Sequence, residues 1–220
     1  MPKESLQARI YSQLKEQIIR GVYSVGQQLS LDELAGAWGI SKTPVREALQ
    51  RLRTEGLVQI VPRVGYFVAV PTIEAIQELF EARAELEGIT VALAAQRASA
   101  GDLLYLRTMH VATQVSDPAV IAQYPTHNKR FHIAVARMTR NNTLAELLTT
   151  VMDKLEWIAY FLRQSNPELD TQRMTEEHEQ LLSALEQHDP AGAREAVMRS
   201  IRRSHQLALE ALAGAGLEKG

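Results

Sequence analysis

The chain has 220 residues, of which 45% are apolar and 23% are charged, and its formal net charge is -2. This length allows one or two domains with cores of their own, and the composition is ordinary for a globular protein. The absence of cysteine excludes disulfides, thiolate metal sites and cysteine nucleophiles. No apolar run is long enough to cross a bilayer, and the first residues lack the apolar core of a secretory signal. We therefore expect a cytoplasmic protein with no membrane partner.

Positive charge is concentrated in the first third of the chain. Residues 1–70 contain nine Lys and Arg against six Asp and Glu, although the chain as a whole is slightly acidic. Because attraction to phosphate groups acts locally, this third can bind nucleic acid despite the overall charge.

The first elements in chain order predict a helix-turn-helix. Apolar residues recur at helical spacing over residues 6–20, and Gly21 and Gly26 bracket a turn. Residues 30–33 have the pattern of a capping box, which opens a short helix ending at Trp38. Gly39 lies in the tight turn before the next helix, and this order of elements is typical of the motif.

Residues 41–56 read S-K-T-P-V-R-E-A-L-Q-R-L-R-T-E-G and predict a short, basic, amphipathic helix. Thr43 can cap this helix, Pro44 suits its first turn, and Gly56 can adopt the left-handed conformation that ends it. Apolar residues occupy one face and basic residues the others, which suits insertion into a DNA major groove. A solvated surface helix is the alternative, and the neighbouring elements favour DNA binding.

A wing follows this helix directly. Residues 57–61 and 66–70 are rich in apolar and β-branched residues and predict two strands, joined by a turn at Pro62-Arg63-Val64-Gly65. We therefore predict a winged helix-turn-helix domain at residues 1–70 and a short linker at residues 71–76.

Every periodic segment after the wing is helical. Pro71 ends the wing and Thr72 can cap the helix that follows. We expect helices at residues 73–97, 102–115, 120–138, 143–163, 171–188 and 191–212. The predicted fold class is mainly α, with the winged domain followed by an all-α helical bundle at residues 77–220.

The motifs resemble those of GntR-family transcription regulators of the FadR (FCD) subfamily, over nearly the whole chain. L-A-G-A-W-G-I-S-K-T-P-V-R-E-A-L-Q-R-L-R-T-E-G-L-V and P-R-V-G-Y-F-V resemble the DNA-binding domain of that family. R-A-E-L-E-G-I-T-V-A-L-A-A and F-H-I-A-V-A-R-M-T-R-N-N-T-L resemble its effector domain. The resemblance implies a DNA-binding regulator, usually a repressor, and not an enzyme. It also implies a homodimer that binds a palindromic double-stranded DNA operator and responds to a small-molecule effector.

The predicted DNA contacts lie on the basic helix and in the wing turn: Ser41, Lys42, Thr43, Arg46, Arg51, Arg53, Arg63 and Gly65. By the resemblance, the first turn of the helix touches DNA and Gly65 approaches the minor groove. Arg46 can bind two acceptors on a guanine edge. Lys42 stands where many members carry arginine, and it lacks the planar fork that reads bases well. Arg51 and Arg53 lie further along the helix, where phosphate, solvent or the partner domain are all open as their contacts.

The resemblance also implies a divalent, zinc-like metal ion in the effector domain, which many members hold through one Asp or Asn and three histidines. The matching positions here are Asn128, His132, His178 and Ser200. Asn128 and His132 are four residues apart on one helix face and could converge on an ion. Ser200 replaces a histidine, so zinc would bind more weakly. A metal-free polar pocket is the alternative, and the other four histidines (His110, His127, His188 and His205) are expected at the surface or in caps.

The predicted effector-binding residues are Arg83, Asn128, His132 and His178. Related proteins often use an arginine at the position of Arg83 to hold a ligand carboxylate, so a small organic acid is the expected effector. Glu87, one turn on, is the alternative partner of Arg83. A metal-responsive regulator, an acyl-CoA-responsive regulator and, more remotely, a metal-dependent hydrolase are the alternative functions. The hydrolase lacks a convincing general base beside a complete metal triad.

Overall fold

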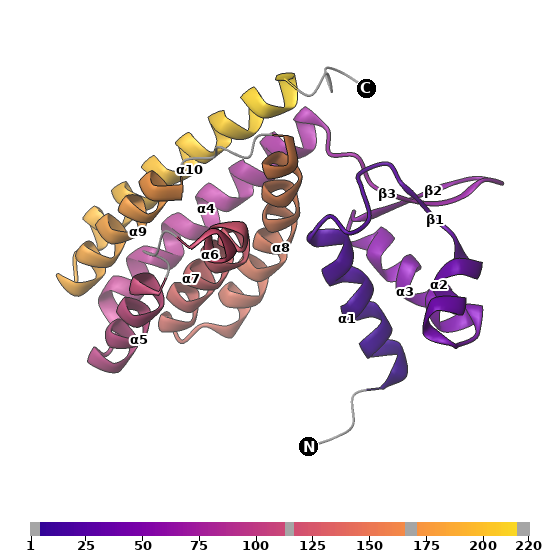
Figure 1. Ribbon diagram of the computed structural model, residues 1–220. Helices are drawn as coiled ribbons and strands as arrows, with labels where there is room; N and C mark the ends of the chain where they lie inside the picture. Colours follow the sequence, from indigo (N-terminus) through magenta and orange to yellow (C-terminus); the bar gives the residue numbers. More distant parts are fainter. Residues whose placement is uncertain (1–4, 113–116, 166–170, 215–220) are drawn as a thin grey trace. The chain divides into compact units, whose positions relative to one another are not determined.

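The computed structural model describes residues 5–112, 117–165 and 171–214 (Figure 1). The chain divides into two compact units, Met1–Pro71 and Thr72–Gly220. The first combines helices with a small sheet, and the described part of the second is helical. The predicted fold class is thereby confirmed.

The helices of the first unit are α1 (Leu6–Ile19), α2 (Leu31–Trp38) and α3 (Lys42–Thr54). α1 and α2 both pack against α3. Leu14 and Ile18 of α1 and Leu49 and Leu52 of α3 are fully buried in the shared core. Gly39 follows α2 with a φ of 62°, in the left-handed conformation that favours glycine, and so provides the tight turn between α2 and α3.

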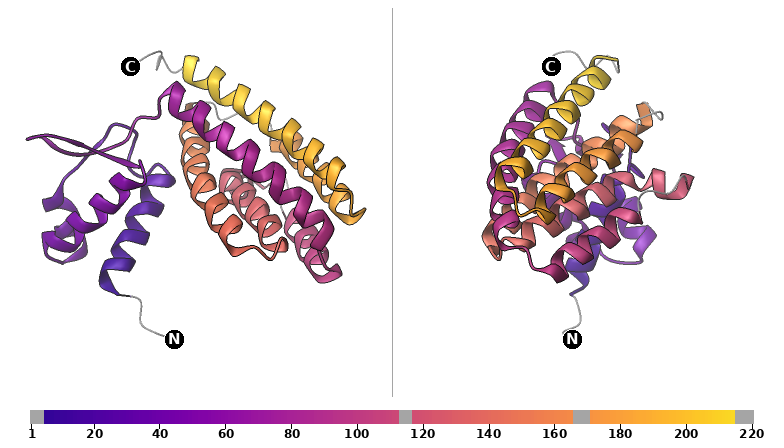
Figure 2. Two further views of the ribbon diagram at one scale, coloured as in Figure 1. Left: turned by 180° about the vertical axis from the view of Figure 1, so that it is seen from behind. Right: turned by 90° about the vertical axis from the view of Figure 1, so that its left-hand side faces the viewer.

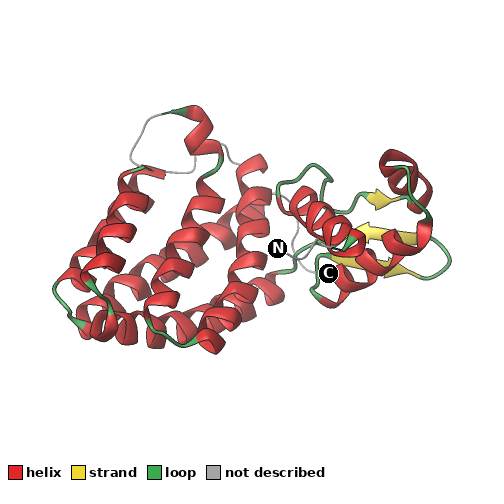
Figure 3. Ribbon diagram, turned by 90° about the horizontal axis from the view of Figure 1, so that it is seen from below, coloured by secondary structure: helices red, strands yellow, loops and turns green. Residues whose placement is uncertain are grey.

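The wing contains a third strand that the sequence did not reveal. β2 (Val58–Val61) and β3 (Gly65–Val68) form the expected antiparallel hairpin, and β1 (Gln28–Leu29) pairs with the other edge of β3. Figure 3 shows these strands together in yellow. The predicted two-stranded wing is therefore corrected to a three-stranded sheet. A strand of two residues is too short to show the alternation by which strands are recognised.

The second unit begins with α4 (Ile73–Arg97). Thr72 caps this helix, because its side-chain oxygen accepts a 3.2 Å hydrogen bond from the amide of Ala75. The cap lets the helix start at Ile73, so residues 73–76 of the expected linker are helical.

The remaining helices are α5 (Ala100–Val111), α6 (Pro118–Ala122), α7 (Tyr124–Met138), α8 (Asn142–Ser165), α9 (Thr171–Glu186) and α10 (Pro190–Gly214). α4 lies beside α10 along much of its length (Figure 2) and also packs against α7, α8 and α9. Side chains on the buried faces of α4 therefore reach the interior of the bundle. None of the described helices is long and apolar enough to span a bilayer.

The single helix expected at residues 120–138 is two helices. α6 ends at Ala122, and α7 starts at Tyr124 with Pro125 in its first turn. Proline has no amide hydrogen and its ring collides with the carbonyl four residues earlier, so a continuous helix through Pro125 is disfavoured.

Candidate DNA-binding surface and effector pocket

α3 carries five of the predicted DNA contacts (Lys42, Thr43, Arg46, Arg51 and Arg53), and it begins two residues earlier than expected. Ser41 is the N-cap, and its side chain makes no capping hydrogen bond. Thr43, the cap expected from the sequence, lies inside the helix. Pro44 occupies the third helical position, where its missing amide hydrogen costs nothing, so the helix can extend back past it. Ser41 and Thr43, which both carry a hydroxyl group, are exposed.

The basic residues of α3 differ in whether they already form ion pairs with other side chains. Arg46 and Arg53 are exposed and form no ion pair with any described residue. Lys42 is paired with the carboxylate of Asp32 on α2. Arg46 and Arg53 are therefore the guanidinium groups of this helix that are available to DNA without breaking an existing contact.

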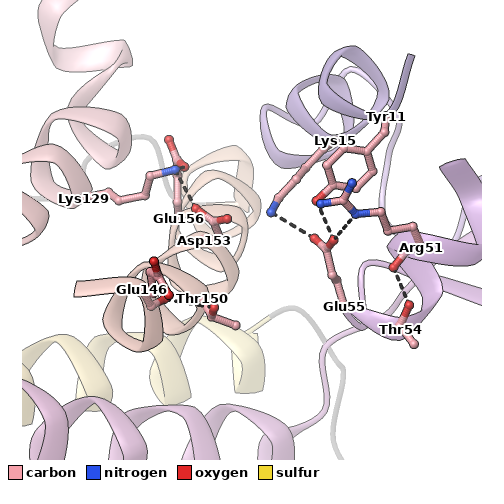
Figure 4. A network of polar contacts seen from close by, with 10 residues as sticks. All are labelled: Tyr11, Lys15, Arg51, Thr54, Glu55, Lys129, Glu146, Thr150, Asp153 and Glu156. Carbon is pink, nitrogen blue, oxygen red and sulfur yellow. Dashed lines mark hydrogen bonds and ion pairs between the residues drawn. The ribbon is translucent and has the colours of Figure 1, made fainter. Parts of the chain in front are cut away.

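Arg51 belongs to a cluster that joins α1 to α3 (Figure 4). Its guanidinium carbon lies 3.7 Å from the centre of the Tyr11 ring, and its Nε is 3.6 Å from Glu55. Glu55 also accepts a 2.5 Å hydrogen bond from the Tyr11 hydroxyl and pairs with Lys15 at 2.9 Å. Burial, reinforced by the bond to Glu55, raises the pKa of Tyr11. Arg51 thus has a structural role in this unit, with which any contact to phosphate would compete.

The wing turn holds Arg63 in a conformation that non-glycine residues rarely adopt. The amide of Val64 donates a 3.1 Å hydrogen bond to the carbonyl of Val61, with Pro62 and Arg63 between them. Arg63 has a φ of 65°. This pattern is that of a type II turn, whose third position normally requires glycine. A left-handed conformation costs an ordinary residue about 1–2 kcal/mol.

The second unit contains a pocket of about 400 Å³ between its helices. α4 contributes Phe80 and Arg83, α7 contributes Asn128, and α8 and α10 supply most of the remaining wall. This volume is within the range of small-molecule sites, about 300–1,000 Å³. The pocket is therefore the candidate effector site of this unit.

Arg83, Glu87 and His132 form a closed triangle of contacts beside the pocket. Arg83 Nε donates to Glu87 Oε1 at 2.7 Å, and His132 Nδ1 lies 2.7 Å from Glu87 Oε2. The third side joins an Arg83 terminal nitrogen to His132 Nε2 at 3.3 Å. All three side chains are buried, at 4%, 1% and 2% exposure. The sequence-based alternative of an Arg83–Glu87 pair is thus present, and Arg83 also faces the pocket.

The charge of Glu87 is stabilised by its two partners. Burial by itself would raise the pKa of this carboxyl group, but Arg83 and His132 outweigh burial and lower the pKa to about 2. Glu87 is therefore ionised at neutral pH.

His178 and Asn128 satisfy each other. His178 Nε2 lies 2.9 Å from Asn128 Oδ1, and because an amide oxygen only accepts, Nε2 carries the hydrogen. The His178 ring stacks on Phe131 with centroids 4.1 Å apart. Burial, as the largest cause, lowers the pKa of His178 well below its ordinary value, so the ring is neutral.

Ser200, the fourth residue matched to the metal site, is hydrogen-bonded to a glutamate instead. Ser200 donates a 2.9 Å hydrogen bond to Glu177 Oε2, and Arg203 donates a 3.0 Å bond to Glu177 Oε1. The sequence reading did not include Glu177, because nothing in the chain's spacing links it to Ser200.

These residues are a poor fit to a resident divalent metal ion. Asn128 and His178 are bonded to each other, His132 is bonded to Glu87 and Arg83, and Ser200 is bonded to Glu177. An ion at this place would replace these bonds and lie beside the Arg83 guanidinium. The described residues contain no group of three or more His, Cys, Asp or Glu arranged to hold a metal.

The expectation that the remaining histidines lie at the surface or in caps is wrong for His110. This residue is 1% exposed, and its Nε2 lies 2.9 Å from Glu179 on α9. A contact of this kind between two helices leaves no signal in local spacing. His205 stacks on Phe80 with ring centroids 4.8 Å apart. His188 lies just after the end of α9, and its Nδ1 bonds to the carbonyl of Ala95.

A second polar network, which sequence reasoning missed, joins α7 to α8 (Figure 4). Lys129 pairs with Asp153 at 2.8 Å and with Glu156 at 2.6 Å. Thr126 donates a 2.6 Å hydrogen bond to the other oxygen of Glu156, which is buried. Lys129 and Glu156 also line the pocket, and within the described residues their charges are already paired.

Comparison with protein families matches each unit to a separate model. Residues 6–68 match the bacterial regulatory proteins of the gntR family, and residues 78–203 match the FCD domain. The second match alone covers more than half of the chain.

Individual relatives agree with these matches. The chain is 30% identical to the Uxu operon regulator of Haemophilus influenzae over 211 residues, which is 86% of this chain and 76% of the relative. It is 26% identical to the transcriptional repressor GlaR of Escherichia coli, over 93% of this chain and 96% of that protein. Among solved structures, McbR/YncC of E. coli has a TM-score of 0.79 at 25% identity and covers 94% of this chain, with 98% of its own length matched.

Proposed function

Because the chain belongs to the GntR family of bacterial regulatory proteins and carries an FCD domain, we propose that it is a repressor whose DNA binding is controlled by a small organic acid. That it is a DNA-binding transcription regulator, and not an enzyme, follows from the family. The hydrolase alternative is therefore set aside. The acid, the repressing direction and a two-fold dimer are the parts that we propose.

The observation that carries the proposal is the buried guanidinium of Arg83 in the wall of the 400 Å³ pocket. A planar guanidinium can bind both oxygens of a carboxylate. Its existing contacts to Glu87 and His132 hold it in place, so little side-chain freedom is lost when a ligand binds.

The DNA part is assigned to the first turn of α3 and to the wing turn. Arg46 has the length and planarity to read a guanine edge, and Ser41 and Thr43 suit phosphate oxygens. In a two-fold dimer each α3 reads one half of a palindrome, with half-sites about 10 base pairs apart or a multiple of that spacing. The relative GlaR is a repressor by name, which supports the proposed direction of control.

Selection of duplexes from a random library by the full chain tests the proposal. We expect an inverted repeat to be enriched, and we expect the complex with it to dissociate when an acid that binds the protein is added. Enrichment of a lone half-site would contradict the dimer. An acid that binds yet leaves the complex unchanged would contradict control by that pocket.

The metal-responsive alternative has a separate test. Because each of the four matching residues already has a protein partner, we expect purified protein to contain less than equimolar metal and to keep its DNA affinity in chelator. Equimolar, tightly held metal would restore that alternative. An acyl-CoA ester has no free carboxylate for Arg83, so we expect it to compete poorly with acids.

A further inference from the structure

The walls of the pocket specify the class of acid more narrowly than the family does. We propose that the effector is an amphipathic monocarboxylic acid, bound without a resident metal ion, with its carboxylate at Arg83 and its apolar body between α8 and α10. This inference rests on the proposed function, since it names the ligand of the same pocket.

The wall around Arg83 is prepared for one carboxylate. A guanidinium has five N–H donors, and the described contacts of Arg83 to Glu87 and His132 use two of them. Asn128 gives its oxygen to His178, which leaves its NH₂ group as a donor beside the pocket. These donors are held by buried partners, so they are oriented before any ligand arrives.

Much of the remaining wall is apolar. Aliphatic side chains from two helices make up most of it: Leu155, Ile158, Leu162, Leu207, Ala208 and Ala211. Placing a hydroxyl against such a wall without a hydrogen-bond partner is unfavourable. A polyhydroxylated sugar acid would have to bury several hydroxyls there, whereas an aliphatic or aromatic acid would gain from leaving water.

The charges elsewhere in the wall disfavour a second carboxylate. Lys129 is the other cationic side chain of the wall that could bind a second carboxylate, but it already pairs with Asp153 and Glu156. Glu156 and Glu210 line the same pocket. A second carboxylate would therefore meet acids or apolar side chains, and a dicarboxylic acid of the same length should bind more weakly.

Isothermal titration calorimetry of the full chain with butyrate, hexanoate and octanoate tests the inference in chelator-treated buffer. We expect Kd to fall roughly fourfold for each added methylene until the pocket is full, because each buried methylene contributes about 0.8 kcal/mol. Gluconate and adipate have the six carbons of hexanoate. We expect both to bind at least about tenfold more weakly, because they carry hydroxyls or a second carboxylate.

Two variants of α10 test whether the alkyl chain of the acid lies in the pocket. Ala211→Phe fills part of the pocket from its aliphatic wall and should weaken octanoate more than butyrate. Ala191→Phe makes the same change at an exposed position outside the pocket and should leave the Kd values of the three acids unchanged. Circular dichroism of both variants checks that the helices are intact, and the wild-type series decides the matter if Ala211→Phe does not fold.

The outcomes separate this inference from the proposed function. Tighter binding of gluconate or adipate than of hexanoate, or binding that requires added Zn²⁺, would overturn the inference and leave control by an organic acid standing. Absence of binding by every acid in the series would overturn both.

Discussion

At the scale of single residues, Arg63 is the clearest case of a local cost that the fold alone does not explain. Its φ of 65° is at a turn position that favours glycine, although Gly65 is only two residues away. Strained conformations tend to persist where a side chain is needed for function. Arg63 and the wing turn are therefore natural candidates for contact with DNA.

Replacing Arg63 by glycine should move stability and DNA affinity in opposite directions. Arg63→Gly should raise the free energy of unfolding by about 0.5–1 kcal/mol, because the strain disappears. The same variant should bind operator more weakly, with a salt slope smaller by about one. Arg63→Lys is the control, since it keeps both the strain and the charge. An Arg63→Gly protein with unchanged affinity and salt slope would exclude a DNA contact at Arg63.

Arg46 should carry sequence discrimination. Arg46→Ala should cost about 1–3 kcal/mol of operator affinity and relax the preference at one base pair of each half-site. Arg9→Ala removes another exposed arginine, on α1 and outside the proposed surface, and serves as the control. Equal losses in the two variants, measured by fluorescence anisotropy, would mean that only general charge is involved.

At the scale of elements, the contact between α1 and α3 separates two arginines that look alike in sequence. Arg51 lies over Tyr11 and beside Glu55, whereas Arg53 has no partner among the described residues. Arg51→Ala should therefore lower the free energy of unfolding by about 0.5–1 kcal/mol, and Arg53→Ala should not change it. Urea unfolding compares the two variants directly. Equal stability of the two would show that the cluster around Glu55 contributes nothing.

The pairing of α4 with α7 should appear as a pH dependence of stability. The pKa of Glu87 is lowered from its ordinary 4.5 to about 2, so its contribution is present above about pH 4.5 and is lost as the pH falls toward 2. Glu87→Gln leaves Arg83 buried without its ionic partner and should cost about 3–5 kcal/mol at neutral pH.

The difference between wild type and Glu87→Gln should therefore shrink as the pH falls from 4.5 to 2. The fluorescence of the buried Trp157, followed during unfolding of each protein, measures this stability difference in the second unit. Glu85→Gln, at an exposed position of α4, is the control and should show no such change. A constant difference across this pH range would contradict the proposed charge of Glu87.

Individual elements show what could be predicted from the sequence. The bounds of α4 were predicted to the residue, because Pro71, Thr72 and the apolar period are all local signals. β1 was missed because two residues carry no period, and the division of α6 from α7 was missed although Pro125 marks the first turn of α7.

The candidate site divides in the same way. The pair of Arg83 with Glu87 is local and was foreseen as an alternative. The bonds of Ser200 to Glu177, of His110 to Glu179 and of Lys129 to Glu156 join different helices. Their partners depend on how the helices pack, and no spacing within one helix encodes that packing.

At the scale of the whole molecule, we propose one chain with two coupled functions, in which α3 and the wing bind DNA and the pocket beside α4 binds an acid. Coupling between two binding sites is reciprocal by thermodynamic necessity. If an acid weakens operator binding by some factor, operator must weaken acid binding by the same factor. This holds whatever path connects the two units.

The most direct test is to measure that reciprocity with hexanoate and the selected duplex. Operator Kd is measured by fluorescence anisotropy with and without saturating hexanoate, and hexanoate Kd is measured by calorimetry with and without saturating duplex. We predict that the two ratios are equal and lie between about 5 and 150, the usual range of allosteric coupling. Hexanoate that binds the protein with both ratios equal to one would contradict the central claim that the pocket controls DNA binding.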